Sequence, residues 1–289
     1  MDALDRAGAA TGDVASGLDA LEMWHGAGAS RLRRVAGVVL PKLVAVAVLL
    51  GVWQLAVTLH PSDVLPSPGE VWASFLDQAR QGHVTDAVST SLLHGGEGYA
   101  IAIVAGTPLG LLIARVRVVR LAIGSIVAAL QSLPSVTWVP VGILWFGLNT
   151  SMVLFVVVMG ALPSIAGGMV SAVDHIPPLL PRVGTALGAR GLRLYRHVIL
   201  PAALPGYVAG LKQAWAFSWR SLMAAEIIAT GPDLGRGLGQ LLESGRELTD
   251  MSLMFASILV ILAVGVLVDA LVFAPLDRGV RRRRGLSTA

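Results

Sequence analysis

The chain has 289 residues, of which 55% are hydrophobic and 14% are charged, and its formal net charge is +4. A soluble domain has about a quarter charged residues, so this composition, with a mean hydropathy of +0.73, argues against a soluble protein and indicates a surface that faces lipid. The absence of cysteine excludes disulfides and thiolate metal sites, and the placement of the arginines beside apolar segments argues against nucleic-acid binding.

Residues 1–30 are predicted to form a mobile cytoplasmic tail. They lack the basic start and apolar core of a signal peptide and contain the acids Asp2, Asp5, Asp13, Asp19 and Glu22. An ordered amphipathic helix without a special role is an equal alternative. We expect the rest of the chain to be one transmembrane domain, residues 31–280, followed by a basic cytoplasmic tail, residues 281–289.

The apolar runs predict an all-α membrane protein with about six transmembrane helices, since roughly 20 helical residues cross the hydrocarbon core. Pro134 and Pro140 interrupt the third run, and a proline removes a backbone donor, so a kink or re-entrant break is expected there. The stretch LPSPGEVWASFLDQAR is predicted to be a short interfacial helix. The six runs are residues 35–59, 91–114, 118–146, 151–172, 207–228 and 251–273.

Arginine placement predicts the orientation of these helices. With both ends in the cytoplasm, the longer outer loops hold mainly acids, and the cytoplasmic stretches hold the arginines, as the positive-inside rule requires. An odd number of helices would place one arginine cluster on the wrong side. The cytoplasmic arginines are Arg31, Arg33, Arg34, Arg115, Arg117, Arg120, Arg182, Arg190, Arg193, Arg196, Arg278 and Arg281 to Arg284.

The stretch between the fourth and fifth spans, residues 174–205, is too apolar for a solvated loop and too charged to cross the membrane. Its prolines predict a short helix from Pro177 to about Leu187, with Gly188 in the left-handed conformation that ends it. A second helix is expected to end at Pro201 and Pro205, with Leu192, Tyr195, Val198 and Ile199 on one face. Together these helices form a compact knob whose exposed apolar side chains need a partner.

The knob resembles the cytoplasmic loop of ABC importer permeases, in which Glu-Ala-Ala is followed by Gly, Ile and Leu-Pro at fixed spacing. Here Arg182 and Gly184 depart from the acid and an alanine at the front, while the second half fits closely. LGARGLRLYRHVILPAALP looks like sulfonate, taurine and nitrate permeases. The resemblance assigns ATPase coupling to Arg182, Gly184, Leu187, Gly188, Ala189, Leu192, Tyr195, Val198, Leu200 and Pro201.

Four other segments resemble the same subfamily in the same order: LPSPGEVW at 65–72, GTPLGLL at 106–112, LPSVTWVPVGILWFG at 133–147 and WRSLMAAEII at 219–228. The resemblance implies a permease that forms a homodimer and works with two ABC ATPase subunits and an extracytoplasmic solute-binding protein in a bacterial inner membrane. Its substrate would be a sulfonate, nitrate or another small organic anion. ATP and magnesium would be bound by the ATPase, because the chain has no GxxxxGK[ST] sequence.

The candidate substrate-pathway residues are three ionisable residues inside the apolar runs, Arg220, Glu226 and Glu97, together with Trp219 beside Arg220. A charge at bilayer depth costs about 2.5–3.5 kcal/mol on insertion scales, so each charge should face protein or water. For Arg220 two interpretations stand: it attracts an anionic substrate, or it pairs with a helix-end carboxylate or with backbone carbonyls. Glu97 is expected to pair with His94 or Arg220, and Asp269 with a cytoplasmic arginine. No metal or catalytic set is expected.

Two other classes of function stay open as alternatives. A secondary carrier or channel would work without an ATPase, and a carrier is expected to show duplicated halves with matched broken helices. A membrane enzyme would place paired carboxylates or histidines at one depth. Gly106, Gly110, Gly206 and Gly210 form small-xxx-small patterns, which we interpret as helix packing within the chain.

Overall fold

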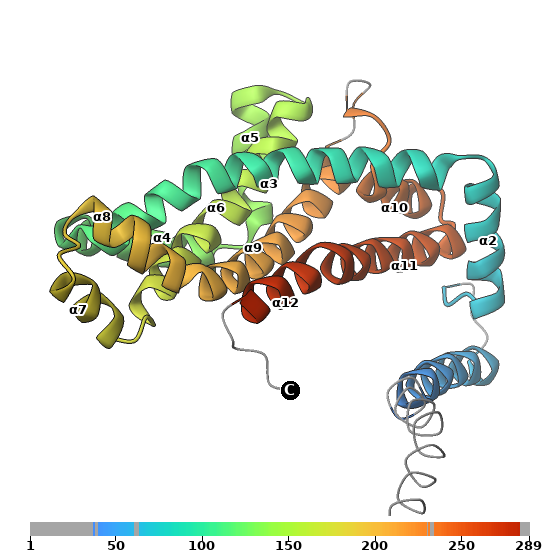
Figure 1. Ribbon diagram of the computed structural model, residues 1–289. Coiled ribbons are helices and arrows are strands. Elements are labelled where there is room, and N and C mark those ends of the chain that lie inside the picture. Colours follow the sequence, from blue (N-terminus) through green and yellow to red (C-terminus); the bar gives the residue numbers. More distant parts are fainter. Residues whose placement is uncertain (1–36, 38–39, 61–63, 230, 232–233, 284–289) are drawn as a thin grey trace, which may run out of the picture. The chain divides into compact units, whose positions relative to one another are not determined.

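The computed structural model describes residues 37, 40–60, 64–229, 231 and 234–283 (Figure 1). The predicted tail at residues 1–30 lies outside the described residues, as does most of the tail at residues 281–289. The chain divides into two units, Met1–Pro68 and Gly69–Ala289.

The first unit contains one described helix, Leu40–Leu59, whose 20 residues are long and apolar enough to cross a membrane. Its leucines and valines are exposed around the helix, and Leu49 is 70% exposed. A helix that is apolar on all sides fits a lipid environment. In the second half of this helix, the Trp53 indole N–H donates to the Pro66 carbonyl at 3.0 Å.

The second unit is built from helices, and none of its described residues lies in a strand. Three long helices, α3, α6 and α9, run side by side (Figure 1), and α10 packs against α9 and α11. The short helix predicted in LPSPGEVWASFLDQAR is present as α2. The elements are α2 (Pro68–Arg80), α3 (His83–Arg115), α4 (Arg117–Ser132), η1 (Ser135–Trp138), α5 (Val139–Phe146), α6 (Thr150–Asp174), α7 (Leu179–Ala186), α8 (Leu192–Leu194), η2 (Tyr195–Ile199), α9 (Leu200–Ile228), α10 (Leu238–Glu247), α11 (Met251–Val268), η4 (Asp269–Phe273) and α12 (Ala274–Arg283).

Among the described residues, four helices meet the length and hydropathy of a membrane span: Leu40–Leu59, His83–Arg115, Thr150–Asp174 and Met251–Arg282. The bent pair Arg117–Ser132 and Ser135–Phe146 adds a fifth if it counts as one span. The fifth predicted span, residues 207–228, lies in α9, which has 29 residues but carries Lys212, Arg220 and Glu226. Of these three residues Glu226 is buried, whereas Lys212 and Arg220 are exposed.

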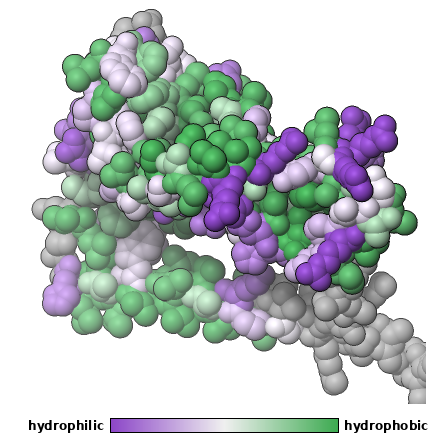
Figure 2. Space-filling model, turned by 90° about the vertical axis from the view of Figure 1, so that its left-hand side faces the viewer, coloured by the Kyte–Doolittle hydropathy of each residue, from purple (hydrophilic) through white to green (hydrophobic). Residues whose placement is uncertain are grey.

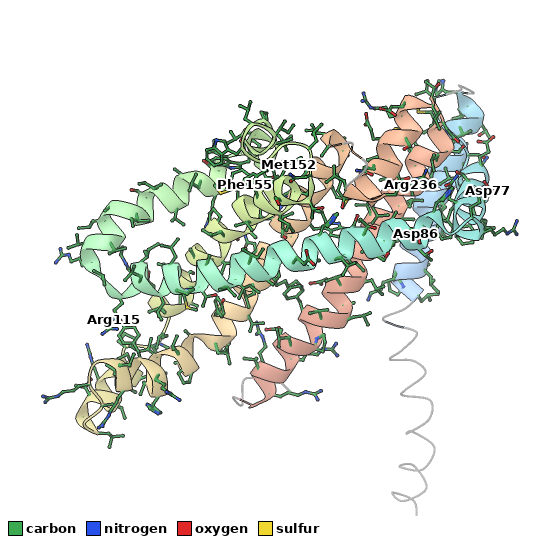
Figure 3. The ribbon with its side chains drawn as sticks, turned by 90° about the horizontal axis from the view of Figure 1, so that it is seen from above. Asp77, Asp86, Arg115, Met152, Phe155 and Arg236 are labelled. Carbon is green, nitrogen blue, oxygen red and sulfur yellow. The ribbon has the colours of Figure 1, made fainter. Side chains whose placement is uncertain are left out.

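The predicted interruption of the third span is confirmed. α4 and the following helices meet at 104°, with Leu133 and Pro134 in extended conformation between α4 and η1. Pro140 does not break a helix, because it lies in the first turn of α5, where a proline needs no donor. α5 then packs over α6 near Met152 and Phe155 (Figure 3), where a Cβ on Gly142 would lie 2.9 Å from Met152 Cγ.

Glycines let α6 approach its neighbours closely. A Cβ on Gly110 of α3 would lie 2.6 Å from the Ala166 carbonyl oxygen of α6, and one on Gly210 of α9 would lie 2.9 Å from Gly168 Cα. Gly106 and Gly206 also face α6. A Cβ on Gly106 would lie 3.1 Å from Ile165 Cβ, and one on Gly206 would lie 3.2 Å from Ala172 Cβ. These glycines therefore pack within the chain, as the sequence predicted.

The α6–α9 crossing generates a stability prediction. Gly210→Ala should lower the apparent melting temperature of the detergent-solubilised protein, because the methyl group meets backbone that cannot move aside, and overpacking costs about 1–3 kcal/mol. Gly96→Ala, in α3, is the matched control because nothing lies within 4 Å of its Cβ position. Its melting temperature should stay the same or rise, and equal losses for both variants would contradict the packing assignment.

Candidate functional site

The knob begins with α7, which ends where the sequence predicted. Gly188 has φ +87°, and its N–H donates to the Thr185 carbonyl at 3.0 Å, while the Ala189 N–H donates to the Gly184 carbonyl at 3.0 Å. These two bonds form a Schellman motif, which satisfies the last carbonyls of the helix. Glycine is the residue suited to this position, because a side chain disfavours the left-handed conformation.

The second predicted helix of the knob does not end at Pro201 and Pro205, so that expectation was wrong. α8, η2 and α9 follow one another without a gap from Leu192 to Ile228. The Leu200 N–H donates five residues back to the Tyr195 carbonyl, and this wider π-helical turn accommodates Pro201, which has no N–H of its own. Membrane helix and knob are therefore one continuous element, so a displacement of the knob can be transmitted directly to α9.

Gly184 brings the two halves of the knob into contact. It is buried, and a Cβ at this position would lie 2.8 Å from Leu194 Cδ1 and 2.9 Å from Val198 Cγ2. The glycine that departs from the family pattern thus allows α7 to pack tightly on η2. The Arg115 guanidinium lies 5.2 Å from the centre of the Tyr195 ring, which links the knob to the end of α3.

The residues to which the sequence resemblance assigns coupling divide into an inward and an outward set. Tyr195, Val198, Leu200 and Pro201 are half-buried, whereas Arg182 and Gly188 are exposed. Leu192 was expected to share a face with the inward set, but it is 70% exposed, and Leu187 is 83% exposed. In the space-filling view of the side where α7 lies, hydrophobic and strongly hydrophilic side chains lie next to one another (Figure 2). An apolar surface bordered by arginines is typical of a protein-binding site.

Charged residues lie at both ends of the helix bundle, in two groups that are separated by the length of α3 (Figure 3). Arg115 lies at one end of α3 and Asp86 at the other, and Asp77 and Arg236 lie near the Asp86 end (Figure 3). At the knob end, Arg120 pairs with Asp174 at 2.8 Å. The predicted partner of Asp269 was wrong: Lys212 of α9, not an arginine, lies 2.9 Å from its carboxylate.

Glu226 is buried in a hydrogen-bonded cluster and is only 3% exposed. Ser91 Oγ of α3 lies 2.9 and 2.7 Å from its two carboxylate oxygens, and the Gly239 N–H donates to it at 3.0 Å. The Leu238 N–H donates to Ser91 Oγ at 2.8 Å. The carboxylate thus caps the N-terminus of α10, where the helix dipole favours negative charge, and joins α3, α9 and α10.

The sequence did not single out Ser91, although its spacing from His94 places both residues on one face of α3. The His94 Nδ1 lies 3.7 Å from the Glu226 carboxylate and has no hydrogen-bond partner among the described residues. Glu97, the predicted partner of His94, instead points to the exposed side of α3. It forms no ion pair with any described residue, so the structure does not bring it to His94 or Arg220.

Trp219 and Arg220 are neighbours in α9 but lie in different surroundings. Trp219 is buried and stacks on Trp215 with ring centres 6.0 Å apart. Arg220 is exposed and lines a cavity of about 300 Å³ beside the break after α4. The structure thus places Arg220 in a cavity, together with residues of the break after α4.

Comparison with known proteins identifies relatives among transporters. The family described as "binding-protein-dependent transport system inner membrane component" matches residues 106–282, more than half of the chain. The chain is 29% identical over 240 residues to the nitrate import permease of Leptolyngbya laminosa, covering 81% of this chain and 85% of that protein. It is 27% identical over 230 residues to the taurine transport system permease of Escherichia coli, covering 77% and 82%.

A further relative is a putative ABC transporter permease of Methanocaldococcus jannaschii, 28% identical over 188 residues, which are 65% of this chain and 69% of that protein. Among solved structures, a chain of the inward-facing MetNI methionine ABC transporter superposes with a TM-score of 0.59 at 21% identity, covering 73% of this chain and 99% of that one. The structural match establishes a shared fold.

The buried Glu226 cluster generates a second stability prediction. Glu226→Gln should lower the apparent melting temperature, because the neutral amide loses the charge that strengthens the hydrogen bonds from Ser91 and Gly239, and a hydrogen bond to a charged group contributes about 1.5–3 kcal/mol. Glu97→Gln is the matched control in the membrane region. It should be neutral or stabilising, since it removes an unpaired charge from the surface of α3; a loss comparable to that of Glu226→Gln would contradict the assignment.

Proposed function

The chain belongs to the binding-protein-dependent transport system inner membrane components, and from this premise we propose that it is the permease subunit through which an ABC importer moves a small anion. Separate ATPase subunits supply the energy, and two copies of the chain form the pathway between them. The protein is a multi-pass component of a bacterial inner membrane, oriented with the knob and both ends in the cytoplasm. A solute-binding protein delivers the substrate to the opposite face.

The observation that carries this proposal is the exposed apolar surface of the knob, where Leu187 and Leu192 face away from the rest of the chain. The 289 residues contain no GxxxxGK[ST] sequence for ATP, so nucleotide and magnesium belong to a partner. When ATP closes the ATPase dimer, the seated knob moves with it. The continuous run from α8 into α9 then transmits this movement to the membrane helices, which alternate between inward and outward openings.

The substrate class rests on two independent features. Relatives with 29% and 27% identity are named as nitrate and taurine permeases, and these substrates carry an oxyanion. The positive side chain of Arg220 in a membrane-spanning helix is compatible with the same class. We therefore propose a sulfonate, nitrate or another small oxyanion as substrate.

The knob generates a coupling prediction. Leu187→Asp should reduce ATPase recovery at least about tenfold when the tagged permease is purified in mild detergent from cells that contain its transport partners, because it places a charge in an apolar contact. Uptake should fall in parallel. Leu248→Asp is the matched control, since Leu248 is 71% exposed beyond α10, far from the knob along the chain.

In this experiment an ATPase must co-purify with the wild-type permease. Uptake by vesicles that contain the permease alone would contradict the proposal and favour a secondary carrier. Unchanged ATPase recovery and uptake with Leu187→Asp would remove the knob as the coupling surface.

A further inference from the structure

The Arg220 cavity lies where two segments from the knob end of the molecule reach into the membrane region. Arg220 is twenty residues along α9 from Leu200, about 30 Å at 1.5 Å per residue. α4 starts at Arg117 and extends about 24 Å before its break, and Ser132, Leu133 and Pro134 line the same cavity. The cavity is therefore far along α9 and α4 from the arginine-rich knob end.

The guanidinium is held in place but is not neutralised. Its Nε donates to the Ala216 carbonyl at 3.1 Å, and it lies 4.6 Å from the centre of the Phe217 ring. Neither contact supplies a negative charge, and no described residue forms an ion pair with Arg220. The two terminal nitrogens have no hydrogen-bond partner among the described residues.

The walls of the cavity suit an anion. None of the described residues that line it is acidic, whereas Gln131, Ser132, Ser135 and Ser164 contribute polar side chains. The Gln131 amide is fixed by donating to the Pro163 carbonyl at 2.7 Å. A volume of about 300 Å³ accommodates a small molecule, and the break after α4 creates the space that a straight helix would fill.

From this isolation of charge we infer that the Arg220 cavity is an oxyanion-binding site within the membrane region, for a sulfonate or nitrate group. The guanidinium presents two parallel N–H donors, which match two oxygens of a planar or tetrahedral oxyanion. Serine hydroxyls of the break and of α6 complete the coordination. The inference deepens the proposed function by placing a substrate contact in the permease itself, and it rests on that proposal for the identity of the ligand.

Direct binding tests the site without ATPase or binding protein. The purified permease in nanodiscs of neutral lipid is titrated with trifluoromethanesulfonate, and binding is followed by fluorine NMR line broadening with nitrate as competitor. Arg220→Gln should weaken binding about ten- to hundredfold, the usual effect of losing hydrogen bonds to a charged group. Arg220→Lys should retain part of the affinity, because it keeps the charge but loses the two-donor geometry.

Arg236→Gln is the matched control, since Arg236 is an exposed arginine at another cavity, beside α2 and α10, and it should bind as the wild type does. Arg220→Gln should fold, because removing a charge favours membrane insertion, and its melting temperature checks this. Absence of binding to the wild type, or equal binding by Arg220→Gln, would overturn the site. Such a result would leave the coupling role untouched, because ATPase recovery with Leu187→Asp tests that role separately.

Discussion

The close contact of α6 with α3 and α9 is the constraint on which the rest of the structure depends. In a membrane the surrounding lipid is as apolar as the helix surfaces, so helices associate through close packing rather than through release of water. Gly168 and Gly210 bring α6 and α9 nearly into backbone contact, and Gly110 does the same for α3 and α6. This core fixes the position of α9, which continues from the knob at its N-terminal end and carries Arg220 in its C-terminal half.

Two charged side chains of α9, Glu226 and Arg220, differ in how far neighbouring groups satisfy them. Glu226 is enclosed by donors from Ser91 and Gly239 and so stabilises the junction of α3, α9 and α10. Arg220 is anchored only by a carbonyl and an aromatic ring, and its charge is left available. The difference explains why we assign structure to one and ligand binding to the other, although the two residues are six positions apart on one helix.

The knob combines a tightly packed interior with an exposed apolar surface. Its interior depends on Gly184, which admits Leu194 and Val198, and on Gly188, which ends α7. Its surface offers exposed leucines and arginines that no described part of the chain covers. This packed interior and the continuous run from α8 into α9 are the features that the proposed coupling to an ATPase would use.

The sequence by itself determined the features that depend on local chemistry: the apolar spans, the break at Pro134, the α7 terminus at Gly188 and the permease family. The prediction that a helix ends at Pro201 was wrong, because whether a helix ends at a proline depends on the turn before it. The prediction that Asp269 pairs with an arginine was also wrong, because its partner is Lys212. Only the tertiary structure decided that Glu226 meets Ser91 while Glu97 faces outward and Arg220 faces a cavity. Those partners lie far apart along the chain, and the rotation of each helix about its axis is set by packing against its neighbours.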